Sequence, residues 1–165
     1  MIESSRNAII DDLPDIVKIY NTTVAGGIST ADTEEVSVES KVAWFHSHDA
    51  KTRPIWVKEY HGKIIAWISF QPFYGRPAYS KTAEISIYLD PNFRGKKLGQ
   101  QFLKEAIMKA PELGINNLLA FIFGDNTASL KLFKKFGFKE WGHLPGVAEI
   151  DANEKDLLIL GLRVI

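Results

Sequence analysis

The sequence of 165 residues contains no cysteine. Disulfides, thiolate metal sites and a cysteine nucleophile are therefore excluded. The sequence also has no excess of either charge, because 20 lysines and arginines balance 20 aspartates and glutamates. Nucleic-acid and membrane binding both draw on a net basic surface, so we expect neither kind of partner. His46 and His48 are two positions apart on an expected helix and do not share a face, so we expect no metal site.

Long apolar runs are missing as well. None approaches the roughly 18 residues that a membrane-spanning helix needs. The N-terminal segment MIESSRNAIIDDLPD is acidic and has no long apolar core, so we expect no secretory signal and a cytoplasmic protein. A length of 165 residues is enough for one domain with a core and too short for two ordinary ones, and an apolar fraction of 45% is typical of a globular protein. We therefore predict a single domain over residues 1–165.

Hydrophobic periodicity predicts an α/β domain with a mixed sheet of about seven strands and four helices. Strands are expected at residues 7–10, 54–60, 63–70, 82–89, 117–123, 138–144 and 156–164. Helices are expected from residue 13 to near the glycines 26 and 27, and at 38–47, 98–110 and 126–136, with Asp12 and Asp125 as N-caps. In the 82–89 strand, alternation places Glu84, Ser86 and Tyr88 on the face opposite Ile85 and Ile87.

The segment NFRGKKLGQQF, residues 92–102, combines three basic side chains and two glycines with no acid. It follows an expected strand and opens an expected helix, where unpaired N–H groups and the helix dipole favour anions. Neither GxxxxGK[ST] nor GxGxxG is present, so the two common nucleotide loops do not fit. Taken alone, this segment is equally consistent with an anion site and with a solvated turn.

A second segment, NTASLKLFKKFGF at residues 126–138, occurs together with RGKKLG at residues 94–99. The pair resembles two motifs of the GCN5-related N-acetyltransferases, in which the first binds the pyrophosphate of acetyl-CoA and the second its pantetheine arm. The expected order of strands and helices is also that family's order. The resemblance implies the GNAT fold, acetyl-CoA as co-substrate and N-acetyl transfer. It implies these cofactor contacts: Ile87, Tyr88, Leu89, Arg94, Gly95, Lys96, Lys97, Leu98, Gly99, Asn126 and Ser129.

Three further segments, IYNTTV, AWF and GRPAYSKTAEISIYL, resemble the phosphinothricin and methionine sulfoximine acetyltransferases. That subgroup carries an Arg, a Tyr three residues on and a Glu five further, which here are Arg76, Tyr79 and Glu84. The resemblance implies a small amino-acid-like amine as substrate and a homodimer. Glu84 would be the general base, directly or through a water, Arg76 would hold the α-carboxylate, and Tyr79 would shape the same pocket. A solvated strand carboxylate, an exposed loop arginine and a core aromatic remain open as alternatives for these three residues.

Three departures from the pattern matter. Lys97 stands where the family has glycine; we expect a helical backbone there, so that the lysine adds a charge. Phe133 stands where many members carry the Tyr or His thought to protonate the CoA thiolate, so either water serves or that step needs no acid. Residues 148–156 do not follow the subgroup, which leaves phosphinothricin itself open as a substrate.

With no cysteine and no GxSxG pattern, the predicted mechanism is direct attack in a ternary complex. Three alternatives stay open. The first is acetylation of a peptide N-terminus or lysine, which predicts an open groove instead of a closed pocket around Arg76. The second is a non-catalytic acyl-CoA-binding module, and the third is a nucleotide-binding regulator.

Overall fold

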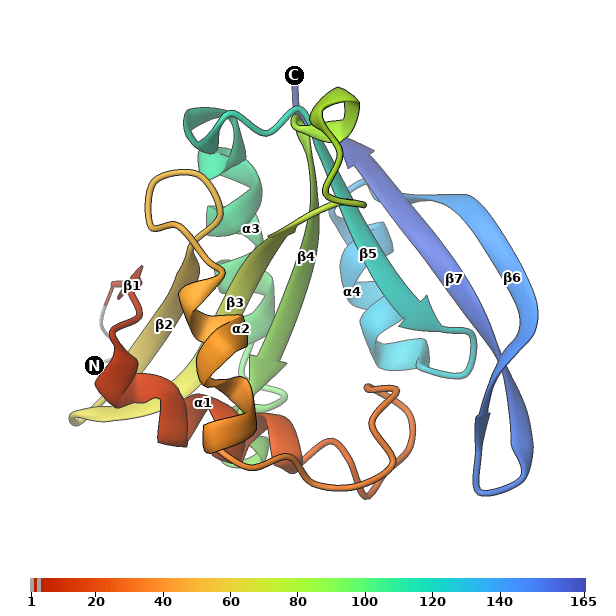
Figure 1. Ribbon diagram of the computed structural model, residues 1–165, viewed down its shortest axis with the longest axis horizontal. Helices are drawn as coiled ribbons and strands as arrows, with labels where there is room; N and C mark the ends of the chain where they lie inside the picture. The colour runs from red at the N-terminus through yellow and green to blue at the C-terminus, as the bar shows by residue number, and fades with distance from the viewer. Residues whose placement is uncertain (1, 3) are drawn as a thin grey trace.

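The computed structural model describes residue 2 and residues 4–165. One seven-stranded sheet runs through the molecule in the order β1-β2-β3-β4-β5-β7-β6 (Figure 1). The strands are β1 (Arg6–Asn7), β2 (Ile55–Tyr60), β3 (Lys63–Pro72), β4 (Thr82–Leu89), β5 (Asn117–Phe123), β6 (Lys139–Ile150) and β7 (Asn153–Arg163). The α-helices are α1 (Leu13–Asn21), α2 (Val42–His46), α3 (Leu98–Lys109) and α4 (Thr127–Lys135). The predicted α/β class with a mixed sheet is confirmed.

Helices cover both faces of the sheet, because strands and helices each bury an apolar side. α3 and α4 pack on one face, where Phe102, Leu103 and Phe133 join the larger core cluster. α1 packs on the other face through Leu13 and Ile16, and α2 lies beside it (Figure 1). None of the helices in the described part of the chain is long and apolar enough to cross a membrane.

The central feature of the sheet is the parallel pair β4 and β5. Their register covers only three positions, from Thr82↔Asn117 to Glu84↔Leu119. Beyond Glu84 the two strands diverge, which is visible in Figure 1 as a wedge between them. On its other side, β4 stays paired with β3 from Ala83 to Leu89. The second half of β4 therefore has one edge that no strand covers.

Element boundaries differ from the expectations at both strand and helix ends. The first strand covers 6–7 instead of 7–10, and the last two strands, at 139–150 and 153–163 instead of 138–144 and 156–164, form a longer hairpin than expected. The first helix stops at Asn21 and continues as turns, and the second consists of a 3-10 turn (Glu39–Lys41) followed by only five α-helical residues. The expected cap Asp12 receives the Ile9 N–H (2.8 Å) and the Arg6 guanidinium, and its side chain does not cap α1.

The N-cap of α4 was assigned to the wrong residue. Asn126 accepts the Ser129 N–H (3.2 Å), whereas Asp125 forms an ion pair with Lys155 of β7. Both residue types are good caps, so the choice depended on a partner far away in the sequence.

The divergent residues 148–156 form the tip of the β6–β7 hairpin, around the turn at Asp151 and Ala152.

Candidate active site

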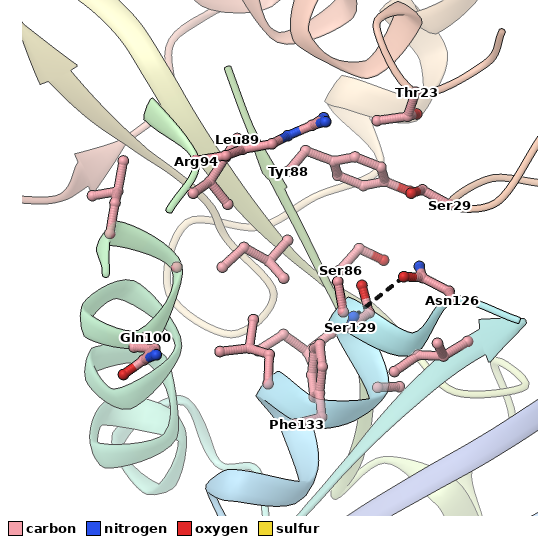
Figure 2. Close-up of a pocket in the computed structure, with 18 of the residues that line it drawn as sticks. Thr23, Ser29, Ser86, Tyr88, Leu89, Arg94, Gln100, Asn126, Ser129 and Phe133 are labelled. Carbon is pink, nitrogen blue, oxygen red and sulfur yellow. Dashed lines mark hydrogen bonds between the residues drawn. The ribbon is translucent and has the colours of Figure 1, made fainter. Parts of the chain in front are cut away.

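A cavity of about 580 Å³ opens where β4 and β5 diverge (Figure 2). Its walls come from the second half of β4, the segment that leads into α3, the middle of β5 and the start of α4. Ten of the eleven predicted cofactor contacts line it, namely Ile87, Tyr88, Leu89, Arg94, Gly95, Lys97, Leu98, Gly99, Asn126 and Ser129. The exception is Lys96, whose ammonium lies 5.1 Å from the centre of the Phe93 ring. The structure thus brings three separate sequence segments to one hollow.

The uncovered edge of β4 runs along this cavity. Ile85 to Leu89 all contribute to the lining, and they lie beyond the last pair with β5. Backbone N–H groups fixed in a strand are donors that need no reorganisation to stabilise a developing negative charge. This edge can therefore polarise a carbonyl group placed in the wedge.

One end of the cavity is an anion cradle. Arg94 and Lys97 line it, and α3 begins at Leu98 with its positive dipole end facing the same loop. Gly95 has a φ of 73°, which only glycine adopts without cost. Charge, helix dipole and a turn that lets the backbone approach together suit a phosphate group.

The expectation that the Lys97 backbone is helical is wrong. Lys97 is the residue before α3 and adopts a left-handed conformation, with φ 64° and ψ 6°. The reason is local geometry, because the chain must turn there to enter the helix. A glycine would accommodate this turn without strain, and the lysine adopts the same backbone at a cost.

The start of α4 forms the opposite wall of the cavity. The Asn126 side chain is buried, and its oxygen accepts the Ser129 N–H, drawn as a dashed line in Figure 2. Asn126 is therefore both the helix cap and a lining residue. Phe133, one of the departures from the family pattern, also lines the cavity and packs edge-on against Phe138, with ring centres 5.0 Å apart.

A second cavity, of about 220 Å³, lies on the opposite face of β4, under α1 and α2. Tyr20, Trp44, Trp67 and Tyr88 form its aromatic walls. Tyr88 stacks on Trp67 with ring centres 4.5 Å apart and meets Tyr20 edge-on at 5.3 Å. Ser86 and Tyr88 line both cavities, so the two adjoin at β4.

Glu84 lies on β4, on the face that carries Ser86 and Tyr88, and it is opposite Gln71 in the register with β3. It lines neither cavity, although its neighbour Gln71 lines the smaller one. Burial raises the pKa of the Glu84 carboxyl above its usual value. Burial also raises the pKa of Tyr88, and the nearby charge of Glu84 adds to that increase. Glu84 is therefore a partly buried carboxyl group beside the point where the cavities adjoin.

Arg76 and Tyr79 line neither cavity. They belong to the loop between β3 and β4, where a 3-10 turn spans Pro77–Tyr79, and both are exposed. Tyr79 packs edge-on against Phe73 (5.6 Å) and Tyr74 (5.8 Å). Within one chain, Arg76 and Tyr79 therefore contribute nothing to the lining of either cavity.

Sequence reasoning missed several lining residues. Thr23 and Ser29 reach the larger cavity from the turns after α1, and Phe121 reaches it from β5 (Figure 2 labels the first two). Nothing in the local sequence marks them, since they are ordinary turn and strand residues. Only the three-dimensional arrangement brings them to the wedge.

Comparisons with known proteins agree on one family. The model of the Acetyltransferase (GNAT) family matches residues 14–138. The chain is 55% identical over 151 residues to the Bacillus subtilis protein YwnH, provisionally designated a phosphinothricin acetyltransferase, covering 91% of this chain and 92% of YwnH. It is 31% identical over 168 residues to an L-methionine sulfoximine/L-methionine sulfone acetyltransferase of Pseudomonas aeruginosa, covering 99% and 96%. A Sinorhizobium meliloti phosphinothricin acetyltransferase solved with acetyl-CoA superposes with a TM-score of 0.89 at 27% identity, covering 97% and 87%.

Proposed function

The chain belongs to the acetyltransferase (GNAT) family, and we propose that it transfers the acetyl group of acetyl-CoA to the amino group of a small amino-acid-like substrate. The observation that carries this proposal is the cavity between β4 and β5. It combines an anion cradle and an uncovered strand edge, and its walls extend from Arg94 before α3 to Asn126 before α4. These features fit the phosphates, the acetyl carbonyl and the pantetheine arm of acetyl-CoA. The Pseudomonas aeruginosa relative is named for L-methionine sulfoximine and L-methionine sulfone, and YwnH is provisionally named for phosphinothricin; all three are analogues of amino acids, which supports the acceptor class.

We propose direct attack in a ternary complex. Acetyl-CoA supplies an activated acetyl group, and the β4 backbone donates hydrogen bonds to its carbonyl oxygen. The acceptor occupies the smaller cavity, and its amine approaches the acetyl group where Ser86 and Tyr88 line both cavities. Holding both reactants at this point supplies proximity, which is a large part of the rate enhancement.

Glu84 is the proposed general base. An amino group reacts only after it loses its ammonium proton, and Glu84 would receive that proton directly or through one water. Its raised pKa makes it a better proton acceptor than an ordinary carboxylate. Its position on the Ser86 and Tyr88 face, next to the adjoining point, supports this role.

Arg76 and Tyr79 are the proposed contacts of the acceptor carboxylate. Because they are exposed and line neither cavity, this contact requires the loop at residues 73–80 to close over the acceptor, or a second subunit to deliver it. The homodimer that we propose, as in the resembled subgroup, provides the second route.

The test is a thiol-release assay with acetyl-CoA. The acceptor panel contains methionine sulfoximine, methionine sulfone, phosphinothricin, free amino acids, polyamines and a peptide with a free N-terminus. We expect release with the amino-acid class. For Glu84→Gln, we expect kcat to fall by roughly 10²- to 10⁴-fold, while acetyl-CoA binding measured by calorimetry persists.

Each other outcome supports a different function. Release only with the peptide would favour a peptide acetyltransferase. Stabilisation by acetyl-CoA without release on any acceptor would favour a non-catalytic binding module. Stabilisation by ATP but not by CoA would favour a nucleotide-binding regulator. An unchanged kcat in Glu84→Gln would remove Glu84 from the base role.

A further inference from the structure

The smaller cavity is lined by one basic side chain, that of Lys41, with no acidic side chain beside it among the described lining residues. Of its eleven lining residues, four are aromatic, three aliphatic and three neutral polar; the remaining one is Lys41. Among the described residues that line this cavity, none is acidic and Lys41 alone carries a formal charge. A cation in a partly desolvated site favours an anionic partner, because its charge is otherwise incompletely solvated.

The position of Lys41 is defined by its surroundings. It is the last residue of the 3-10 turn that leads into α2, and it is partly buried. Its ammonium lies 5.5 Å from the centre of the Tyr20 ring, within the range of a cation–π contact. In the part of the chain that the structure describes, Lys41 forms no ion pair.

Two of the aromatic walls already have partners for their polar atoms. The Trp67 indole N–H donates to the Ile16 carbonyl (3.1 Å), and the Tyr20 hydroxyl donates to Asp32. These walls therefore offer ring faces, which suit the methylene groups of a ligand. Lys41 is the charged donor among the described lining residues, and hydrogen bonds from a charged donor to an anion are the stronger kind.

We propose that Lys41 binds an anionic group at the end of the acceptor side chain, so that the preferred acceptor is an amino acid ending in a carboxylate or phosphinate. This inference rests on the proposed function, which places the acceptor amine where the cavities adjoin at Ser86 and Tyr88. Those two residues belong to the sheet, whereas Lys41 belongs to the helical layer above it. An acceptor with its amine at β4 extends its other end between the aromatic walls toward Lys41.

The experiment compares Lys41→Met, which keeps side-chain length without charge, with Lys41→Arg, which keeps the charge. The matched control is Lys18→Met, since Lys18 is exposed on α1 and lines neither cavity. Thiol release is measured with two acceptor pairs, glutamate against glutamine and phosphinothricin against methionine sulfone. Each pair sets an anionic side-chain terminus against a neutral one of similar size.

For Lys41→Met, we expect KM to rise by about tenfold to a hundredfold for the anionic acceptors, the range for losing a hydrogen bond to a charged group. We expect KM for the neutral acceptors and every kcat to stay within about twofold, since uniform binding is lost without a change in chemistry. Lys41→Arg should retain most of the preference, and Lys18→Met all of it.

Three results would overturn the proposal: equal KM changes for both acceptor types, no change for either, or a wild-type enzyme that turns over only neutral acceptors. If the wild-type protein releases no thiol with any acceptor of the panel, that result refutes the proposed function instead. In that case, calorimetry with free CoA bound still tests Lys41 on its own. Phosphinothricin must then bind the wild type and bind Lys41→Met at least about tenfold more weakly, and any other result overturns the assignment.

Discussion

Replacing Lys97 by glycine should stabilise the protein while weakening its binding of CoA. The stability gain follows from the backbone, because Lys97 has a φ of 64° immediately before α3. An L-residue in this left-handed region costs roughly 1–2 kcal/mol. Glycine also has more conformational freedom in the unfolded chain, which lowers the free energy of unfolding by about 0.4–1 kcal/mol and offsets part of this gain. The net gain is about 0–1.6 kcal/mol, or up to about 6 °C in Tm for a domain of this size.

The loss of affinity follows from the charge. Lys97 lines the anion cradle but is exposed, so its contribution to phosphate binding is screened by solvent. About 1 kcal/mol, or roughly a fivefold rise in Kd for CoA, is the expected size. Because exposed charges are screened further by ions, this difference should shrink at high salt.

Lys97→Ala is the matched control, since it removes the same charge but keeps a side chain on the left-handed backbone. It should lose affinity like Lys97→Gly without gaining stability. Thermal unfolding and calorimetry on the three proteins separate the two effects. A Lys97→Gly protein that melts below the wild type would refute the backbone argument, and unchanged CoA affinity in both variants would refute the charge argument.

Two further predictions concern Asn126 and Glu84. Asn126→Ala removes the cap of α4 and should cost about 1 kcal/mol, whereas Asn126→Asp keeps an acceptor and should retain most of that stability; equal denaturation midpoints for both would contradict the capping role. Glu84→Gln should be more stable than the wild type at neutral pH. Because burial raises the folded-state pKa of Glu84 above 4.5, the folded protein holds a proton that the unfolded chain has lost, and wild-type stability falls as pH rises through that window. The advantage of Glu84→Gln should therefore be present at about pH 7 and vanish near pH 4, and a gap of equal size at both would contradict it.

Parts of the fold followed directly from local sequence. The strands at 82–89 and 117–123 were predicted with the bounds that the structure shows. The first alternates apolar and polar residues, and the second is a continuous apolar run, so each pattern matched one environment. The expected strands at 54–60 and 63–70 leave only residues 61 and 62 between them, and in the structure His61 and Gly62 form a two-residue hairpin turn with positive φ at both.

Other local features could not be assigned from sequence, because tertiary contacts decide them. Asp125 and Asn126 are adjacent and both suit an N-cap, and only the pairing of Asp125 with Lys155 in β7 shows which one is available. The backbone conformation of Lys97 is likewise decided by its surroundings and not by its residue type. Lysine favours helix and gives no sign of a left-handed backbone, so the turn into α3 overrides the propensity of the residue.

The two cavities differ in how their lining residues are spread along the sequence, which explains why sequence analysis found one and not the other. Most of the larger cavity comes from one stretch of chain, β4 and the loop into α3, with the start of α4 added. Contiguous segments of this kind leave recognisable motifs. The smaller cavity takes single residues from α1, α2, β3 and β4, spread from residue 16 to residue 88. A lysine such as Lys41 is unremarkable in its own segment, and its significance comes from the aromatic, acid-free walls that the fold assembles around it. With the acceptor in the smaller cavity, as we propose, acceptor preference depends on scattered positions that leave no local motif, whereas the proposed acetyl-CoA contacts fall in contiguous segments that do.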